Sequence, residues 1–481
     1  MQNRLLLIIV IVSILLGSSM LTRGHQWGDD FAWYILQAKS IVDGTVDAFI
    51  ETSAFTNTQS TTHVGPLAYP WGYPLILVPA YLLRGIHPLV LKLPNLFFYA
   101  LLLVCLYVWM KSRVARTESL LIVALFAFNP LLLVFLDQIL SDIPFLFFST
   151  LALYLMTRQE KRTLALHIAI GASIFFTTFL RATGILLLGC FLIVEFFRLV
   201  GYRRDWARAK EIIIGAFSVT AVFALLWTIN LLSFPSGEQS YASQYAGASI
   251  EQMRTFAVGY FNVFSSFFGE TKGWAYLYYV LVMFFLVGIW LRWRQELVVV
   301  LFSIFWMIVH ITYPYWQGAR YIFPLLPIFI YFTFVGMKFV VEKVSVANPR
   351  LGQLGLYGFW ALMAANFLLA SVSHAYTNLL YDRVINGPFD TYSKDVYKYI
   401  QEETSEDSIV VFFKPRVMKL MTDRDSIMST ECDRILKGDY LVLSRKVGEN
   451  QQIAPEEIDS CNLPLNQVLK NNRFVVYEIQ K

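Results

Sequence analysis

Long apolar runs recur along the first three quarters of the chain and indicate its class. The first covers 5–21. The others lie near 88–110, 118–136, 142–157, 164–180, 184–200, 211–232, 275–293, 296–313, 320–340 and 354–373. A helix needs about 20 mainly apolar residues to cross the hydrocarbon core of a bilayer, and two of these runs are short for that. The pattern predicts a mainly α, polytopic transmembrane helical bundle of about eleven spans.

A shorter amphipathic pattern follows the first run. Apolar residues recur at helical spacing from Phe31 to Ile41 and stop at Gly44, which predicts a helix with Asp29 and Asp30 at its N-terminus. The helix dipole and the free N–H groups of the first turn favour ionised carboxylates there. Such a pair at the edge of a bilayer suits a general base. The plainer interpretation is an N-cap residue beside a solvated neighbour.

The composition changes near residue 376. Charged residues of both signs mix with short β-rich runs at 408–413, 440–444 and 474–479, and helices are expected at 392–402 and 415–421. We therefore expect two parts, a transmembrane module at 1–375 and a small C-terminal α/β extracytoplasmic domain at 376–481.

Composition and charge support a membrane class and a definite orientation. Hydrophobic residues make up 57% of the 481 residues and charged residues 15%, whereas soluble domains have nearer 25% charged residues. The net charge of +5 arises from clusters near 111–116, 158–162, 198–210, 292–294 and 338–350, in every second loop. This spacing argues against nucleic-acid binding. It predicts a multi-pass inner-membrane protein with a cytoplasmic N-terminus and outer loops at 22–87 and 233–274.

The sequence shows few signs of a cleaved leader peptide, of a cofactor site or of redox chemistry. The first run has no small-residue cleavage site, so we expect a retained anchor. Nucleotide and metal motifs such as GxxxxGK, CxxC and HExxH are missing from the sequence, and we expect no cofactor or metal site, although metal dependence stays open. Cys105 and Cys190 lie in predicted spans. Cys432 and Cys461 lie in the exported tail, where a disulfide is a reasonable hypothesis.

Unusual charges converge on the predicted outer face. Asp142 follows a polar turn, Arg181 interrupts the apolar stretch from 164 to 197, and Arg320 stands at a span entrance. An arginine in or beside a span needs a partner, and a phosphate or carboxylate matches its forked donors. The alternative is that Asp142 and Arg181 pair with each other across two helices.

These motifs together resemble those of the membrane glycosyltransferases of the GT-C class, in the subgroup related to protein O-mannosyltransferases and aminoarabinose transferases. The matching elements are Gly28-Asp29-Asp30 with Tyr34, Tyr69-Pro70-Trp71-Gly72-Tyr73-Pro74, Ser141-Asp142-Ile143-Pro144, Arg181-Ala182-Thr183-Gly184, Arg320-Tyr321 with Pro324 and Pro327, and Phe413-Lys414-Pro415-Arg416 in the tail. Asp30 and Asp142 stand where Glu is common, and Trp71 and Ala182 replace prolines.

The resemblance implies a GT-C fold and a bacterial donor built as a sugar on a polyprenyl phosphate. The expected activity is inverting hexosyl or pentosyl transfer to a hydroxyl of a glycan, lipid or protein acceptor. We expect Asp29 to remove the proton from that hydroxyl, with Asp30 orienting the acceptor or holding Asp29 in position. We expect Arg181 or Arg320 to stabilise the leaving phosphate. Further substrate contacts are expected from Tyr34, Asp142, Tyr321, Tyr73 and, more weakly, Lys39.

Two other functions fit part of this pattern. A polytopic transporter or flippase for a lipid-linked saccharide would also carry intramembrane charges, but the sequence shows no convincing internal repeat. A degenerate scaffold that only binds a lipid-linked sugar is the third possibility. The sugar, the acceptor and the oligomeric state are not predicted from the sequence.

Overall fold

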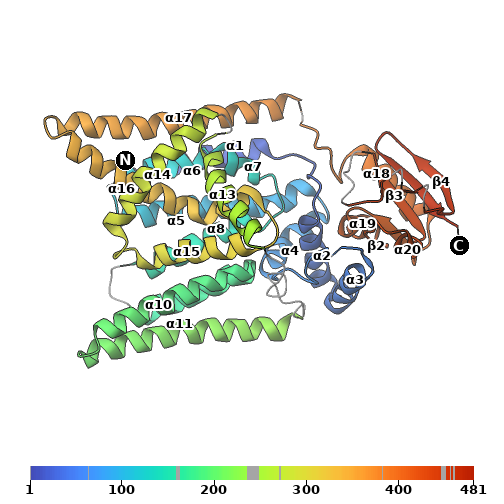
Figure 1. Ribbon diagram of the computed structural model, residues 1–481, viewed down its shortest axis with the longest axis horizontal. Helices are drawn as coiled ribbons and strands as arrows, with labels where there is room; N and C mark the ends of the chain where they lie inside the picture. Colours follow the sequence, from blue (N-terminus) through green and yellow to red (C-terminus); the bar gives the residue numbers. More distant parts are fainter. Residues whose placement is uncertain are drawn as a thin grey trace.

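The computed structural model describes residues 2–62, 64–158, 163–235, 249–269, 272–381, 383–445, 451–454, 457–458 and 461–480. A long helical bundle carries a small sheet domain at one end, and three helices of the first loop lie between the two (Figure 1). The bundle contains α1 (Gln2–Met20), α5 (Pro88–Lys111), α6 (Arg116–Ala127), α7 (Pro130–Phe135), α8 (Asp142–Met156), α9 (Leu164–Leu180), η1 (Ala182–Gly184), α10 (Ile185–Gly201), α11 (Trp206–Ser233), α14 (Lys272–Arg292), α15 (Leu297–Thr312), η4 (Gly318–Leu325), α16 (Leu326–Val344) and α17 (Pro349–Tyr381).

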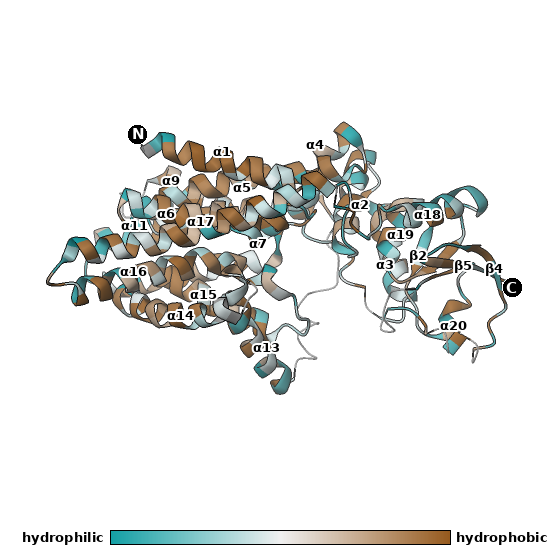
Figure 2. Cartoon of the chain, turned by 90° about the horizontal axis from the view of Figure 1, so that it is seen from above, coloured by the Kyte–Doolittle hydropathy of each residue, from teal (hydrophilic) through white to brown (hydrophobic). Residues whose placement is uncertain are grey.

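The bundle has the length and composition of a multi-pass membrane domain. Six of its described helices are long and apolar enough to cross a membrane, and shorter apolar helices such as Asp142–Met156 and Leu164–Leu180 accompany them. The helices of the bundle are mostly hydrophobic, whereas hydrophilic residues concentrate in loops and in the C-terminal domain (Figure 2). The predicted polytopic helical class is confirmed, and the number of eleven spans stays a prediction.

One predicted span is two helices in the structure. The run at 118–136 breaks between α6 and α7, where Asn129 precedes Pro130. A residue before proline avoids the helical conformation, and Asn129 is accordingly extended with ψ 120°. Its side chain accepts a hydrogen bond from the backbone N–H of Leu132 and so caps the second helix.

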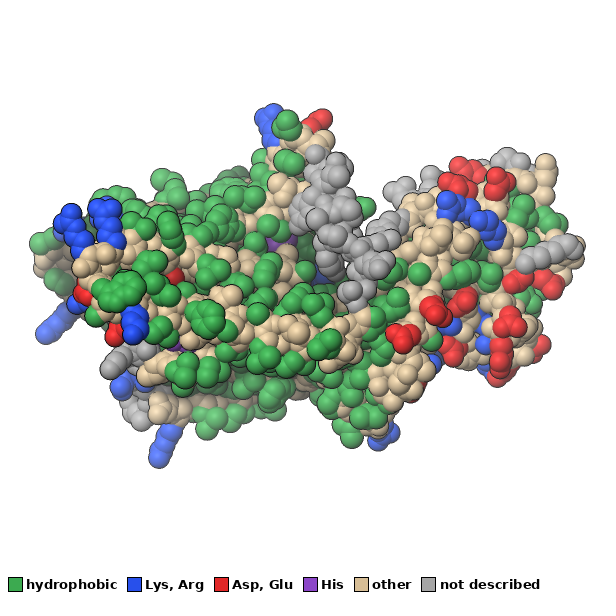
Figure 3. Space-filling view, turned by 90° about the horizontal axis from the view of Figure 1, so that it is seen from below, with side chains coloured by type: hydrophobic (Ala, Val, Ile, Leu, Met, Phe, Trp, Pro, Cys, Tyr) green, Lys and Arg blue, Asp and Glu red, His purple; other side chains and the backbone are tan. Residues whose placement is uncertain are grey.

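Basic side chains gather at the end of the bundle opposite the C-terminal domain. A band of apolar side chains covers the face between that end and the C-terminal domain (Figure 3). Membrane proteins carry Lys and Arg preferentially on cytoplasmic loops. The distribution is consistent with the predicted orientation, which stays a prediction.

The first loop folds into α2 (Asp30–Asp43), α3 (Val46–Gln59) and α4 (Gly72–Arg84). The predicted helix after the acidic pair is confirmed. It ends at Gly44, whose φ of 68° lies in the left-handed region that favours glycine. Asp29 occupies the N-cap position, but its side chain makes no capping hydrogen bond. Asp29 is therefore the N-cap residue by position, but its side chain does not cap the helix.

The C-terminal domain is a five-stranded mixed sheet with strand order β2-β1-β3-β5-β4. The strands are β1 (Ile409–Phe412), β2 (Asp425–Ile427), β3 (Tyr440–Ser444), β4 (Leu465–Lys470) and β5 (Phe474–Ile479), accompanied by α18 (Thr391–Glu403), α19 (Pro415–Thr422) and α20 (Cys432–Ile435). In the register of the sheet, β1 runs parallel to β2 and β3, and Val410 lies beside Tyr440, whereas β5 is antiparallel to both of its neighbours.

The predicted disulfide between Cys432 and Cys461 is confirmed, with 5.7 Å between the two Cα atoms. It joins α20 to the segment that leads into the edge strand β4. Cys105 and Cys190 are free and buried, as expected for cysteines in apolar helices.

The predicted second outer loop, 233–274, contains α13 (Ile250–Val263) and η3 (Phe264–Phe267). Tyr260 packs against Trp316, with ring centroids 4.4 Å apart. This contact places the second loop beside the turn that leads into η4, where the functional residues lie.

Candidate functional site

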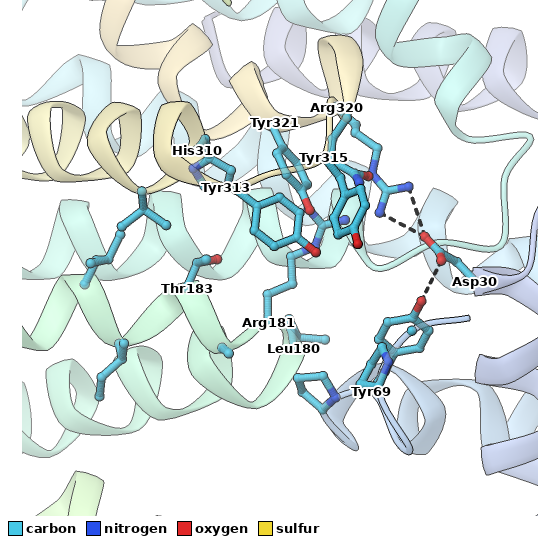
Figure 4. A pocket seen from close by; sticks show the side chains of 18 of the residues that line it. Asp30, Tyr69, Leu180, Arg181, Thr183, His310, Tyr313, Tyr315, Arg320 and Tyr321 are labelled. Carbon is cyan, nitrogen blue, oxygen red and sulfur yellow. Dashed lines mark hydrogen bonds and ion pairs between the residues drawn. The ribbon is translucent and has the colours of Figure 1, made fainter. Parts of the chain in front are cut away.

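A cavity of about 450 Å³ opens at the end of the bundle next to the C-terminal domain (Figure 4). Its lining combines charged, aromatic and aliphatic side chains from the first loop, the α9–α10 turn and the α15–η4 turn. The residues are Asp30, Tyr34, Val64, Gly65, Pro66, Tyr69, Pro70, Leu180, Arg181, Ala182, Thr183, Ile185, Leu186, Val309, His310, Tyr313, Tyr315, Gln317, Arg320 and Tyr321.

Asp30 enters the cavity from the first turn of α2. Its Oδ1 accepts a hydrogen bond from the hydroxyl of Tyr69 at 2.6 Å, and its Oδ2 accepts bonds from both Nη atoms of Arg320 at 3.1 Å (Figure 4). Burial would raise the pKa of Asp30, but the charge of Arg320 and the hydrogen bond from Tyr69 outweigh it, so the pKa lies below its ordinary value. The carboxyl group is therefore ionised at neutral pH.

Asp142 holds two guanidinium groups together. It is the first residue of α8 and is buried, with its Oδ2 2.7 Å from Nη2 of Arg181 and its Oδ1 3.5 Å from Nε of Arg320. Nε of Arg181 also donates to Oγ of Ser141 at 3.0 Å. The pairing of Asp142 with Arg181, considered from the sequence as an alternative, is present, and Arg320 extends it into one network.

The turn after α9 determines where Arg181 points. The chain leaves the helix at Arg181, whose backbone is extended with φ −151° and ψ 132°. It then passes through η1 and turns into α10 at Gly184. A Cβ atom at Gly184 would lie 2.4 Å from the backbone nitrogen of Thr178, closer than any side chain tolerates. The Arg-Ala-Thr-Gly sequence thus requires glycine at its last position because two backbones touch there.

Tyrosine side chains surround the charged network. The Tyr321 ring lies 5.7 Å from the guanidinium carbons of both Arg181 and Arg320. The hydroxyl of Tyr34 hydrogen-bonds with Oγ of Ser141 at 3.1 Å. Tyr313 and Tyr315 also line the cavity (Figure 4).

Comparison with known proteins identifies the fold. No protein-family model and no curated protein matches this sequence. Among solved structures, ArnT from Cupriavidus metallidurans bound to undecaprenyl phosphate aligns with a TM-score of 0.62 and 14% identity over 98% of this chain and 97% of that one. The oligosaccharyltransferase of Archaeoglobus fulgidus aligns with a TM-score of 0.60 and 12% identity over 92% of this chain and 69% of that one.

The chain has the GT-C fold. The arabinofuranosyltransferase AftD from Mycobacteria is a further structural match, with a TM-score of 0.53 and 14% identity over 99% of this chain, although the match spans only 41% of that larger protein. The fold resemblance drawn from the sequence motifs is confirmed. Sequence identity this low establishes the architecture alone, so the chemistry must be argued from the residues.

Asp29, given the role of base from the sequence, lies outside the cavity of this GT-C fold. Its Oδ2 is 3.7 Å from Nζ of Lys414 in the C-terminal domain, and among the described residues its Oδ1 has no hydrogen-bond partner. Burial raises the pKa of Asp29, and the charges of Lys414 and Arg416 only partly oppose this. The pKa values of Asp29 and Asp30 are therefore shifted in opposite directions, although the two residues are adjacent.

Lys39, proposed from the sequence as a weaker phosphate contact, is also outside the cavity. It follows Asp30 by nine residues on α2, and nine steps of about 100° place two side chains on opposite faces of a helix. Its Nζ lies 3.7 Å from Oδ2 of Asp423 beside a separate, smaller pocket. The structure gives no support to a phosphate contact by Lys39.

Tyr73 does not line the cavity but packs against a residue that does. It is fully buried on α4, its ring meets the ring of Tyr34 edge-on at 4.9 Å, and its hydroxyl lies 3.4 Å from Oδ1 of Asn95. The apolar wall of the cavity comes from the α9–α10 turn and from α15, with Leu180, Ile185, Leu186 and Val309.

Arg416 is a site residue that the sequence did not single out. It is 1% exposed on α19, and its guanidinium lies 4.4 Å from the ring of Trp33. Its Nη1 donates to the hydroxyl of Tyr69 at 3.2 Å and its Nη2 to the carbonyl of Pro66 at 2.9 Å. The Phe-Lys-Pro-Arg motif was noted in the sequence as part of the family resemblance. No sequence pattern around it indicated that its arginine contacts the first loop.

Asp137 lies in the same turn as Asp142 but has a different role. It is buried with its Oδ1 2.6 Å from Nζ of Lys92, and its Oδ2 accepts a hydrogen bond from Arg383 at 2.9 Å. Its oxygens also accept bonds from the backbone and hydroxyl of Thr22. This network ties the end of α1 to α5 and to the segment before the C-terminal domain.

Within the described ranges, no three His, Cys, Asp or Glu side chains are grouped so that they could hold a metal ion. The expectation of no metal site stays a prediction, and the sequence left metal dependence open.

Proposed function

We propose that this protein is an inverting glycosyltransferase that moves a sugar from a polyprenyl-phosphate donor to a hydroxyl acceptor at the outer face of the cytoplasmic membrane. One observation carries the proposal: a cavity at the end of an apolar bundle brings two arginines, an ionised aspartate and an aliphatic wall together. A crystal structure with the same fold, that of ArnT, has undecaprenyl phosphate bound, and a structure of the archaeal oligosaccharyltransferase AglB is a complex with an inhibitory peptide and a dolichol phosphate.

The two arginines suit the phosphate of such a donor. A guanidinium has five N–H donors, and the contacts of Arg181 with Asp142 and Ser141 use only part of them. Arg181 and Arg320 are already oriented by Asp142, so little side-chain entropy is lost when they bind an anion. In a site with little water, these fixed cations stabilise the charge that grows on the leaving phosphate.

The aliphatic part of the cavity suits the first isoprene units. Leu180, Ile185, Leu186 and Val309 line the same cavity as Arg181. A polyprenyl phosphate combines an anionic head with a branched apolar chain, and both parts then find complementary surface at once. Its longer tail would leave the protein between the ends of α10 and α15, toward the lipid.

We assign the general base to Asp30 in place of Asp29. The acceptor hydroxyl loses its proton as its oxygen attacks the anomeric carbon, so a carboxylate must lie within hydrogen-bond reach of it. Asp30 faces the cavity and is ionised, and a carboxylate oxygen that accepts one bond retains a further lone pair. The new C–O bond forms while the bond to the phosphate breaks, and direct attack inverts the anomeric centre.

An assay with purified protein tests the proposal. The protein in lipid nanodiscs is mixed with radiolabelled polyprenyl-phosphate sugars and candidate hydroxyl acceptors, and release of free polyprenyl phosphate is followed. We expect sugar-dependent release that Asp30→Asn abolishes and that Lys39→Gln, outside the cavity, leaves unchanged.

Transport is the alternative outcome. Movement of intact lipid-linked sugar between leaflets in proteoliposomes, without cleavage of the phosphate bond, would favour a flippase. Binding without release or movement of the lipid would indicate a scaffold that holds the donor. Either result would overturn the proposed transferase activity.

A further inference from the structure

A second cavity, of about 910 Å³, lies at the other end of the bundle. It is enclosed by the end of α8, the start of α9, the last turns of α10, the first turns of α11 and the segment before α15. This is the end of the bundle far from the C-terminal domain (Figure 1), where basic side chains gather (Figure 3).

Among the described residues, four arginines and two carboxylates line this cavity. Arg158, Arg198, Arg208 and Arg294 come from four different segments, and the carboxylates are Glu195 and Glu211. Buried Glu195 pairs with Arg198 at 3.0 Å within α10, and Arg208 pairs with Asp205 at 3.3 Å. The described part of the lining therefore holds more arginines than carboxylates. Arginine is also the side chain that best matches the oxygens of a phosphate.

The same cavity has an apolar flank. Phe197 and Ile214 line it and are 57% and 50% exposed, and Leu164 at the start of α9 is 63% exposed. Exposed aliphatic and aromatic residues at the end of a membrane bundle face the acyl chains of lipids. An arginine cluster that lies directly beside such a flank is suited to an amphiphile with an anionic head.

We propose that this second cavity binds the phosphate headgroup of an anionic phospholipid, whose acyl chains lie along the apolar flank of α10 and α11. Basic pockets between transmembrane helices take lipid headgroups of this kind. The site lies at the opposite end of the bundle from the proposed glycosyl-transfer cavity. It is therefore independent of the donor and of the transfer chemistry.

Two exposed arginines allow a test that does not disturb the core. Arg208→Gln with Arg294→Gln removes two charges from the cavity, and both side chains are exposed at the protein surface. The matched control is Arg203→Gln with Arg204→Gln, which removes the same charge from exposed positions in the α10–α11 connection that do not line the cavity. Arg198 is kept because it pairs with the buried carboxylate of Glu195.

Lipid binding is measured by native mass spectrometry of the full-length detergent-purified protein with cardiolipin, phosphatidylglycerol, phosphatidylcholine and glycerol phosphate. We expect the two anionic lipids to bind at least about fivefold more tightly than phosphatidylcholine, and the cavity variant to lose at least about fivefold of that affinity. The control variant should lose less than about twofold, as expected for charges outside the contact distance.

Three results would overturn the proposal. Equal losses in the two variants would show a general surface-charge effect with no defined site. Binding of phosphatidylcholine as tightly as of phosphatidylglycerol would remove the role of the arginines. Tight binding of glycerol phosphate that displaces the lipids would show that the cavity takes a soluble phosphate. None of these results bears on release of polyprenyl phosphate, so failure here leaves the proposed transferase activity intact.

Discussion

The guanidinium of Arg416 contacts the hydroxyl of Tyr69 at 3.2 Å, across 347 residues of sequence. The same hydroxyl donates to Asp30, so the C-terminal domain contacts the proposed base through this tyrosine. The guanidinium also covers the ring of Trp33 on α2 and donates to the carbonyl of Pro66, in the segment between α3 and α4. Through these contacts the C-terminal domain braces the first loop.

Replacing Arg416 tests whether it positions Asp30. Arg416→Lys keeps the charge, but it loses one of the two Nη donor groups and much of the stacking on Trp33. We expect transfer to fall about tenfold, with the KM for the donor changed less than kcat. The positive charge of Arg416 helps to lower the pKa of Asp30, so Arg416→Met should also move the acid limb of the pH–rate profile upward. A purely structural role would lower thermal stability without moving that limb.

The two adjacent aspartates should respond differently to neutralisation. Asp30→Asn keeps the volume and removes the base, so transfer should fall at least about 100-fold. Asp29→Asn should reduce transfer less than about fivefold, because Asp29 lies outside the cavity. The measurement is single-turnover release of polyprenyl phosphate. The reverse order of effects would return the role of base to Asp29, as the sequence suggested.

Stability should depend on pH through Asp29. A carboxyl whose pKa is raised on folding weakens the native state as pH rises from the unfolded value, about 3.9, through the folded value. Asp29→Asn removes this penalty, and Lys414, which is 18% exposed, is left with access to water. We expect a higher melting temperature for the variant than for the wild type at pH 8. The difference should shrink towards pH 4. A constant difference across that range would exclude titration of Asp29.

Arg320 should be more sensitive than a surface arginine to conservative exchange. Both of its Nη atoms bond to Asp30, and a lysine has no planar fork with which to reproduce this. Arg320→Lys should raise the KM for the donor about tenfold, whereas Arg204→Lys at the other end of the bundle should leave it unchanged. Donor titration in the release assay measures both. An unaffected KM in Arg320→Lys would move the phosphate contact to Arg181.

The disulfide should stabilise the C-terminal domain. Its cysteines are 29 residues apart, and closing a loop of that length in the unfolded chain is worth about 3–4 kcal/mol in the loop-entropy model. The double substitution Cys432→Ser and Cys461→Ser should lower the melting temperature of the domain by several degrees, and a reductant should have no further effect on the variant. Equal melting temperatures of the variant and the oxidised wild type would contradict this.

Local patterns were sufficient for most elements. The boundaries of α2, β3 and β5 follow from periodicity and turn residues, which act over a few neighbouring positions. The two strands that were not predicted, β2 and β4, lie at the edges of the sheet. The first has three residues and the second is mostly polar or half exposed, so neither carries the alternation of a buried strand.

The sequence by itself determined the membrane class, the GT-C resemblance and a set of candidate charges that includes those at the cavity, because each is encoded in hydrophobicity or in short motifs. Only the tertiary structure decided that Asp30 faces the cavity and Asp29 faces Lys414. Two successive residues at a helix start point about 100° apart, and packing against other elements decides which of them is enclosed. The contact of Arg416 with Tyr69 likewise depends on docking between distant segments, which no local pattern records.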